Sequence, residues 1–233
     1  MADIYILKIM QFPHDRTYEN TDLISSERKR KIHRYKFIED SYRSMIAALL
    51  VRYAVINKTG YKNDELIFCT SEYGKPYLKE PNIQPLHFNF SHSGEYVVCA
   101  IDDEECGVDV EDMSNYSEDI ADNAFHENEV TKLHQYDDNK EAARYFTFLW
   151  TMKEAYLKAL GVGLSKPLSS FCILEDNNKI SITDFEINSR KFSVFESRNI
   201  EYEYVVSYVG NNNPTYHYIS DIELMEYVKK WSH

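Results

Sequence analysis

Residues 106–112 read CGVDVED, and the alternation in this stretch sets the pattern for the fold. Asp109 and Glu111 lie two positions apart, and Val108 and Val110 alternate with them. Two residues is the side-chain period of a β-strand, so both carboxylates are expected on one face and both valines on the other. The stretch therefore predicts a strand with a paired acidic face.

This acidic pair is a candidate cation site. Two neighbouring carboxylates repel each other, and a cation between them turns the repulsion into binding. Carboxylate oxygens suit Mg²⁺, which commonly takes one or two carboxylates together with substrate phosphates. Gly107 would let a backbone or a ligand approach closely. The alternative is a solvent-facing strand with two acidic residues, and the spacing alone favours that alternative.

The composition narrows the class of protein. The chain has 233 residues, enough for one large domain or two small halves that share a core. Its four cysteines show no zinc-type spacing, which indicates reduced thiols and a cytoplasmic protein. Its apolar runs are too short to span a bilayer, and no signal-peptide pattern is present. We therefore expect no membrane partner.

The charge is unevenly distributed. The net charge of −12 argues against a general nucleic-acid binder. Basic residues nevertheless concentrate in one stretch: Arg28, Lys29, Arg30, Lys31, Arg34 and Lys36, followed by Arg43 and Arg52. This stretch predicts either an anion-binding site or a solvated helix face, and the sequence favours neither.

Apolar periodicity predicts five helices and a larger number of strands. The helices are expected at about residues 25–34, 39–58, 140–160 and 221–231, with a short one at 127–135. The strands are expected at about residues 4–9, 66–69, 87–90, 96–101, 171–174, 179–182, 191–195 and 202–209. A long helix followed by a loop and strands occurs twice, at 39–101 and 140–209. This order predicts an α+β fold with two similar halves.

Three shorter features carry possible chemistry. Residues 89–94 read NFSHSG, in which Ser91 and His92 could hold a phosphate in a tight turn, although a plain hairpin turn explains them as well. Lys75 stands between Gly74 and Pro76, where an ordinary turn with an exposed lysine is the local alternative.

On the third long helix, Trp150, Glu154 and Lys158 are spaced four apart and lie away from the apolar stripe. A Glu–Lys pair at this spacing is usually a surface salt bridge. Glu129 lies near the first turn of its own helix, where the helix dipole favours an acid, so a structural role is the default.

Taken together, these motifs resemble a known family. Gly74-Lys-Pro with residues 89–94, then Gly107-Val-Asp-Val-Glu, then WTMKEAYLKALGVGL at residues 150–164 occur in this order. The chain resembles the 4′-phosphopantetheinyl transferases of the surfactin-synthetase-activating type from about Arg28 to Phe171. The last sixty or so residues add no motif.

The resemblance implies a fold and a reaction. It implies two α/β halves, residues 1–104 and 105–233, related by a pseudo-twofold axis, with coenzyme A in the cleft between them. The first half would contact the adenine and the 3′-phosphate, and the second would carry the magnesium site and the docking surface. A serine of an acyl or peptidyl carrier protein would attack the β-phosphorus and release 3′,5′-ADP. We expect a monomeric Mg²⁺-dependent transferase of the holo-[acyl-carrier-protein] synthase type.

The resemblance also assigns roles to single residues. It places Mg²⁺ on Asp109, Glu111 and Glu154, and it places Lys158 near the pyrophosphate. Glu154, Lys158 and Glu129 would be catalytic, with Glu129 as the base for the serine proton. The coenzyme contacts would be the 3′-phosphate cations Arg28, Lys31 and Arg43, the adenine loop Gly74, Lys75 and Pro76, and the phosphate-binding Ser91 and His92. Arg28 stands where a lysine is common, so its contact departs from the family pattern.

Residues 113–135 follow the acidic strand and contain Phe125 and Val130, whose apolar side chains look exposed. We expect this segment to dock the carrier protein, although packing of a short helix is an equal alternative. Two other functions remain compatible with the sequence: a Mg²⁺-dependent hydrolase that cleaves a nucleotide pyrophosphate, and a non-catalytic module that binds coenzyme A.

Overall fold

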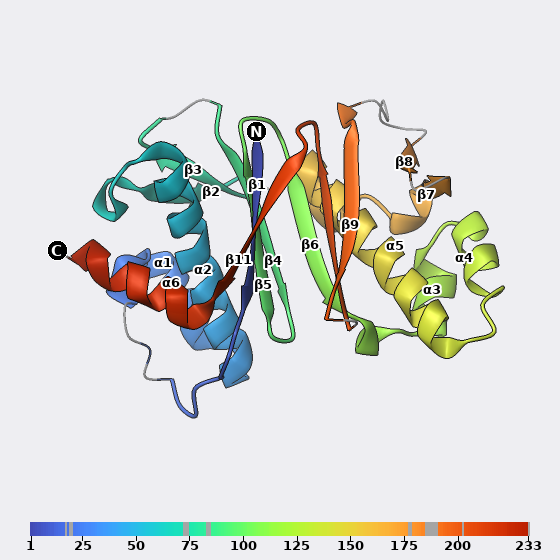
Figure 1. Ribbon diagram of the computed structural model, residues 1–233, viewed down its shortest axis with the longest axis horizontal. Helices are drawn as coiled ribbons and strands as arrows, with labels where there is room; N and C mark the ends of the chain where they lie inside the picture. The colour runs from blue at the N-terminus through green and yellow to red at the C-terminus, as the bar shows by residue number, and fades with distance from the viewer. Residues whose placement is uncertain are drawn as a thin grey trace. The chain divides into compact units, whose positions relative to one another are not determined.

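The computed structural model describes residues 1–16, 18, 21–71, 75–82, 85–176, 179–184, 191–201 and 203–232. The chain forms two compact units (Figure 1). Unit 1 comprises Met1–Glu104 together with Pro214–His233, and unit 2 comprises Glu105–Asn213. The segment from Pro214 onward differs from the expectation, because it belongs to unit 1 and not to the second half.

Unit 1 is built on a four-stranded sheet in the order β11-β1-β5-β4. The strands are β1 (Ala2–Lys8), β4 (His87–Ser93), β5 (Tyr96–Asp102) and β11 (Pro214–Ser220). β5 runs antiparallel to both β1 and β4, whereas β11 lies parallel to β1. His217 of β11 stacks on Tyr5 and contacts Asp3 at 2.9 Å. These contacts bring the end of the chain into unit 1, where no local sequence motif had placed it.

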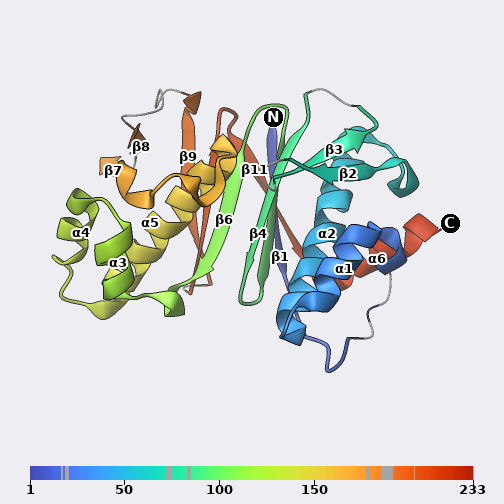
Figure 2. The same ribbon diagram turned by 180° about the vertical axis from the view of Figure 1, so that it is seen from behind.

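The remaining elements of unit 1 follow from local signals. The helices are α1 (Ser26–Arg34), α2 (Ile38–Thr59) and α6 (Asp221–Val228), and the smaller elements are η1 (Thr21–Leu23), η2 (Asn63–Glu65), β2 (Ile67–Thr70), β3 (Pro76–Glu80) and η7 (Lys229–Ser232). Ser25 caps α1 by accepting a hydrogen bond from the backbone of Arg28. Gly60, with a φ of 77°, ends α2 in the left-handed conformation. The three α-helices lie on the same side of the sheet (Figures 1 and 2).

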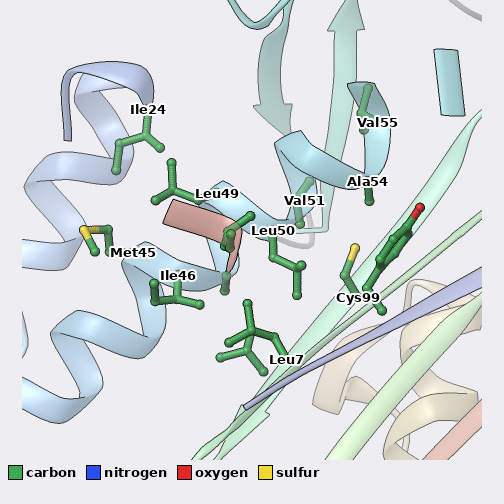
Figure 3. Close-up of a cluster of buried hydrophobic side chains, with 14 of the residues drawn as sticks. Leu7, Ile24, Met45, Ile46, Leu49, Leu50, Val51, Ala54, Val55 and Cys99 are labelled. Atoms are coloured by element: carbon green, nitrogen blue, oxygen red, sulfur yellow. The ribbon is translucent and has the colours of Figure 1, made fainter. Parts of the chain in front are cut away.

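The core of unit 1 lies between these helices and the sheet. Ile46 and Leu50 of α2 lie on the side of Leu7 of the sheet, whereas Met45 and Leu49 lie on the side of Ile24, and all six side chains are buried (Figure 3). The predicted helical stripe over residues 39–58 is therefore the buried face of α2. This packing fixes α1 and α2 relative to β4.

Unit 2 repeats the combination of a sheet and a long helix. Its main sheet has the order β6-β10-β9, formed by β6 (Gly107–Asp112), β9 (Val194–Ile200) and β10 (Tyr204–Gly210). The helix α5 (Asn139–Leu160) packs on β6 and β10. The smaller elements are η3 (Met113–Asn115), α3 (Glu118–Ala124), α4 (Glu127–Leu133), η4 (Gly163–Ser165), η5 (Leu168–Ser170), β7 (Phe171–Asp176) and β8 (Lys179–Asp184).

The predicted α+β class is confirmed. The predicted stripe of the third long helix is buried in α5: Tyr145, Leu149, Met152, Tyr156 and Ala159. The strand at residues 106–112 is present as β6. β3, β11 and α3 were not predicted, because their segments lack a clear apolar period. Over the part of the chain that the structure describes, no helix is both long enough and apolar enough to cross a bilayer.

Candidate active site

The carboxylates of β6 face α5, as the strand period predicts. Lys158 of α5 donates to Oδ1 of Asp109 at 2.5 Å and to the carbonyl of Val108 at 3.5 Å. Asp109 is only 2% exposed. Glu111, two residues along the strand, accepts a hydrogen bond from Asn115 at 3.3 Å. The structure thus joins two segments that are almost fifty residues apart in the sequence.

Gly107 makes this meeting possible. A Cβ atom at residue 107 would lie 2.0 Å from the carbonyl oxygen of Ala155 and 2.5 Å from the backbone nitrogen of Ala159. The backbone of α5 therefore lies directly against β6 at this point. The glycine before the acidic pair is required by the helix that carries Glu154 and Lys158.

The charges around Asp109 are unbalanced. Burial raises the pKa of Glu154, neighbouring Asp109 raises it further, and Lys158 lowers it. Together with Glu111, three carboxylates share this region with the ammonium group of Lys158. Carboxylates gathered in this way favour the binding of a cation.

The donors fit a magnesium ion chemically. They are hard carboxylate oxygens of the kind that Mg²⁺ prefers. Among the residues that the structure describes, no three His, Cys, Asp or Glu side chains are already drawn together around one point. Asp109, Glu111 and Glu154 are the side chains that would hold the ion, with further positions left to water or substrate phosphates.

A second site lies entirely within unit 1. A cavity of about 200 Å³ is lined by Ile24, Ser25, Glu27, Arg28, Lys31, Ala48, Val51, Arg52, Phe68, Cys69, Thr70, Pro76, Phe88 and Phe90. Three of the residues expected to bind coenzyme A therefore share one cavity: Arg28, Lys31 and Pro76. Cations and aromatic rings together suit a phosphorylated nucleotide, since the cations pair with phosphate and the rings offer flat apolar surfaces.

Arg28 is held in place but keeps an unused donor. Its Nη2 donates to the carbonyl of Ser44 at 3.3 Å, and its guanidinium lies 5.3 Å from the ring centre of Phe90. Burial lowers the pKa of Arg28. Its Nε is buried and has no hydrogen-bond partner within the described residues. A partly desolvated guanidinium with a spare N–H is well suited to an anion.

Arg52, one of the basic residues that follow the charged stretch at residues 28–36, also lines the cavity, although the family resemblance assigned it no role. Its Nη1 donates to Oδ1 of Asn63 at 2.8 Å, and its guanidinium lies 4.9 Å from the ring centre of Phe68. Burial lowers the pKa of Arg52 to about 10. The signal that could have revealed it is the presence of an arginine among buried apolar positions of a helix.

Arg43 departs from the expectation. It is not among the described residues that line the cavity. Its Nε donates to the carbonyl of Gly94 at 2.6 Å, and its Nη1 pairs with Asp40 at 2.7 Å. Gly94 forms the turn that follows Ser91 and His92 on β4. In this structure Arg43 braces the predicted phosphate-binding turn.

The loop predicted to contact adenine is only partly described. Gly74 lies outside the described residues. The backbone N–H of Lys75 donates to Oγ of Ser71 at 3.0 Å, and Pro76 begins β3 at the edge of the cavity. Of the two that the structure describes, Pro76 lines the cavity and Lys75 does not.

Glu129 occupies a structural position. It is 1% exposed and pairs with the fully buried Lys153 at 2.9 Å. It also accepts hydrogen bonds from the backbone N–H groups of His126 at 2.9 Å and Ile173 at 2.7 Å. These contacts join α4, α5 and β7. The geometry gives no support to Glu129 as the base for a substrate proton, because its oxygens are engaged inside the core.

Phe125 and Val130 do not form the exposed apolar surface that was expected to dock the carrier protein. Phe125 is 4% exposed and packs against Phe146 and Trp150, with ring centres 5.3 and 6.1 Å away. Val130 is half-buried against the same core. The exposed apolar residue of this segment is Ile120, which lines a cavity of about 220 Å³ beside Glu111 and Trp150.

Comparisons with known proteins identify similar sequences for both units. A model of the 4′-phosphopantetheinyl transferase superfamily matches residues 105–209, and a model of the N-terminal part of 4′-phosphopantetheinyl transferases matches residues 13–104. The chain is similar to 4′-phosphopantetheinyl transferase gsp of Aneurinibacillus migulanus, with 37% identity over 72% of this chain and 68% of that protein. It is similar to 4′-phosphopantetheinyl transferase Sfp of Bacillus subtilis (strain 168), with 38% identity over 68% of this chain and 70% of that protein.

A fungal relative extends the similarity along the chain. 4′-Phosphopantetheinyl transferase pptA of Paxillus involutus is 32% identical over 91% of this chain and 88% of that protein. The matched ranges include both the cavity of unit 1 and the acidic cluster of unit 2. The chain therefore belongs to the 4′-phosphopantetheinyl transferase superfamily, whose members move the phosphopantetheine arm of coenzyme A to a serine of a carrier protein.

Proposed function

We propose that this protein transfers the phosphopantetheine arm of coenzyme A to a serine of an acyl or peptidyl carrier protein in a Mg²⁺-dependent reaction. One observation carries the proposal: Asp109, Glu154 and Lys158, which belong to two separate family motifs, lie together where β6 meets α5. A surface Glu–Lys pair alone would not require a buried aspartate beside it.

In this proposal unit 1 binds the nucleotide end of the substrate. Arg28 and Lys31 of α1 would pair with the 3′-phosphate, and Phe90 and Pro76 would flank the base in the same cavity. Ser91 and His92 would contact phosphate from β4, with Arg43 holding their turn through Gly94. Lys75 is proposed as a further contact from the loop before β3.

The reaction is a displacement at phosphorus. The oxygen of the carrier serine forms a bond to the β-phosphorus, the bridging P–O bond breaks, 3′,5′-ADP leaves and the serine proton is released. Mg²⁺ bound at Asp109, Glu111 and Glu154 would supply charge neutralisation for the pyrophosphate. Lys158 would stabilise the negative charge on the departing phosphate. The residues of the site thus act by orientation and charge, which is what such transfers mostly need.

We also propose the type of activity, the oligomeric state, the location and the partners. The activity would be of the holo-[acyl-carrier-protein] synthase type, carried out by a monomer in the cytoplasm, with neither nucleic acid nor membrane as a partner. The net charge of −12 supports the absence of a nucleic-acid partner.

The decisive experiment is mass spectrometry of a carrier protein after incubation with this protein, coenzyme A and Mg²⁺. We expect the carrier to gain one phosphopantetheine arm on serine. The same incubation with Glu154→Gln should leave it unmodified, whereas Glu141→Gln, an exposed change on the same helix, should not affect it. Release of 3′,5′-ADP without loading would indicate a hydrolase. Binding of coenzyme A without either product would indicate a non-catalytic module.

A further inference from the structure

Lys158 contacts a carboxylate that the proposed metal site needs, that of Asp109. The Nζ of Lys158 lies 2.5 Å from Oδ1 of Asp109. The aspartate side chain is 3% exposed, whereas the lysine side chain is 27% exposed. The ammonium therefore reaches the buried carboxylate from its more accessible side.

The two cations would compete for one carboxylate. A magnesium ligand lies about 2.0–2.1 Å from the ion, so an ion bound to Asp109 would lie only a few ångström from the ammonium that contacts Oδ1 of the same side chain. Two cations at such a separation repel strongly. Asp109 is fixed by its burial in β6, whereas Lys158 has a flexible four-carbon stem and access to solvent. If one of the two moves, it is the lysine.

We infer that Lys158 is an exchangeable cation that neutralises Asp109 when no divalent ion is bound and gives up this carboxylate, when one binds, to pair with the phosphates of coenzyme A. The inference rests on the proposed function, because it uses the same metal site and the same substrate. It assigns Lys158 a second role, as an internal competitor of the metal.

The exchange predicts that removing the charge of Lys158 strengthens the binding of a divalent ion but weakens the coupling between that ion and coenzyme A. Removing the charge of Lys158 should tighten the binding of a divalent ion alone, since the ion no longer has to displace an ammonium. The same change should reduce the cooperativity between the ion and coenzyme A, since the ion no longer releases a cation for the phosphates. Such coupling is reciprocal, so it can be measured from either ligand.

The test is direct binding of Mn²⁺ to the full chain in the absence of coenzyme A, by calorimetry or by the resonance signal of the free ion. For Lys158→Met we expect the dissociation constant of Mn²⁺ to fall about tenfold or more. Lys158→Arg keeps the charge and should resemble the native protein. Lys140→Met changes the net charge equally but lies about 27 Å away along α5, so it should change the constant by less than about twofold.

A thermal-shift measurement checks folding and supports the same inference. Lys158→Met leaves a buried carboxylate without this ammonium, so its Tm without metal should fall, and Mn²⁺ should raise its Tm by more than it raises that of the native protein. The coupling is then measured as the ratio of coenzyme A affinities with Mg²⁺ and with chelator. We expect this ratio to be above one for the native protein and closer to one for Lys158→Met.

Unchanged or weaker Mn²⁺ binding by a folded Lys158→Met would overturn the inference and would make the contact a fixed ion pair that positions α5. Absence of Mn²⁺ binding in both proteins would also overturn it. Either result leaves the proposed function to be judged by loading of the carrier. Conversely, tighter Mn²⁺ binding by Lys158→Met combined with a carrier that the native protein leaves unloaded would refute the proposed function while the exchange at Asp109 stands.

Discussion

At Gly107 the chain has no room for a side chain, because the backbone of α5 lies where a Cβ atom would be. The neighbouring acidic pair depends on this contact. Asp109 faces the helix that carries Lys158 and Glu154. Gly107 sets the distance between this strand and the helix, although it has no side chain to take part in the chemistry. Substitutions around β6 therefore separate into those that remove a charge and those that move the helix.

Glu154→Gln tests the charge alone. The side chain keeps its size but loses the negative charge beside Asp109 and Lys158, so we expect transfer to fall by about a hundredfold or more with little change in Tm. Activity is measured by carrier loading at saturating coenzyme A, with Glu141→Gln as the matched change on α5. Transfer by Glu154→Gln at near-native rates would remove this residue from the site.

Gly107→Ala tests the helix position. Overpacking of a core commonly costs about 1–3 kcal/mol, and here the clash is with backbone, so we expect a loss of free energy of unfolding at the upper end of that range. Gly60→Ala serves as the comparison. It has open space around its Cβ position but a φ of 77°, so it should cost about 1 kcal/mol from backbone strain alone. Equal losses for the two variants would contradict a close contact at Gly107.

Glu129→Gln separates a structural carboxylate from a catalytic one. Breaking a buried ion pair typically costs about 3–5 kcal/mol, so the variant should unfold at a clearly lower temperature because Lys153 is left unpaired. The kcat of the folded fraction and its dependence on pH should stay close to native, since Glu129 is enclosed by the core. A lost limb of the pH–rate profile without loss of stability would restore the role of a base.

At the scale of elements, apolar periodicity was enough to predict α2, α5 and β6, because each has one buried and one polar face. It was not enough for β11, whose place is set by parallel pairing with β1 from the opposite end of the chain. Phe125 shows the same limit for single residues. Its local sequence fits both a docking surface and a packed helix, and the deciding contacts with Phe146 and Trp150 come from another element.

Asp3 joins three elements of unit 1, since it contacts Lys58 of α2 at 2.9 Å and His217 of β11 at 2.9 Å. Burial alone would raise the pKa of Asp3, but the hydrogen bonds and ion pairs with His217 and Lys58 outweigh burial and hold the pKa below its usual range.

A carboxyl group with a lowered pKa stabilises the fold above its unfolded pKa of about 3.9 and loses this contribution as the pH falls through the lower folded value. We expect Asp3→Asn to reduce stability at neutral pH and to show a smaller further loss between about pH 4 and pH 2. The measurement is the free energy of unfolding by urea as a function of pH. Parallel pH curves for the native protein and the variant would exclude this contribution.

At the scale of the whole molecule, a net charge of −12 opposes the approach of anionic coenzyme A. The basic stretch around α1 offsets this repulsion locally, because Arg30, Arg34 and Lys36 are exposed and lie close in the sequence to the cavity residues Arg28 and Lys31. These outer cations would speed association without contacting the bound ligand.

Replacing Arg30, Arg34 and Lys36 together by Gln should lower the association rate of coenzyme A by about threefold or more at low salt and leave the dissociation rate unchanged. In about 1 M salt, where charges are screened within about 3 Å, the difference should vanish. Stopped-flow binding measures both rates, and replacement of Lys140, Lys229 and Lys230 is the matched control for net charge. A difference that persists at high salt would mean that the outer cations touch the ligand.

The return of β11 and α6 to the first unit has a consequence for biosynthesis on the ribosome. Translation proceeds from the N-terminus, and domains generally fold as their residues emerge. A nascent chain exposed as far as Asn213 contains every residue of unit 2, yet unit 1 still lacks the strand that pairs with β1 and the helix that follows it. Unit 1 therefore emerges first but is completed last. Until β11 has emerged, β1 has an unpaired edge of the kind that pairs with other chains.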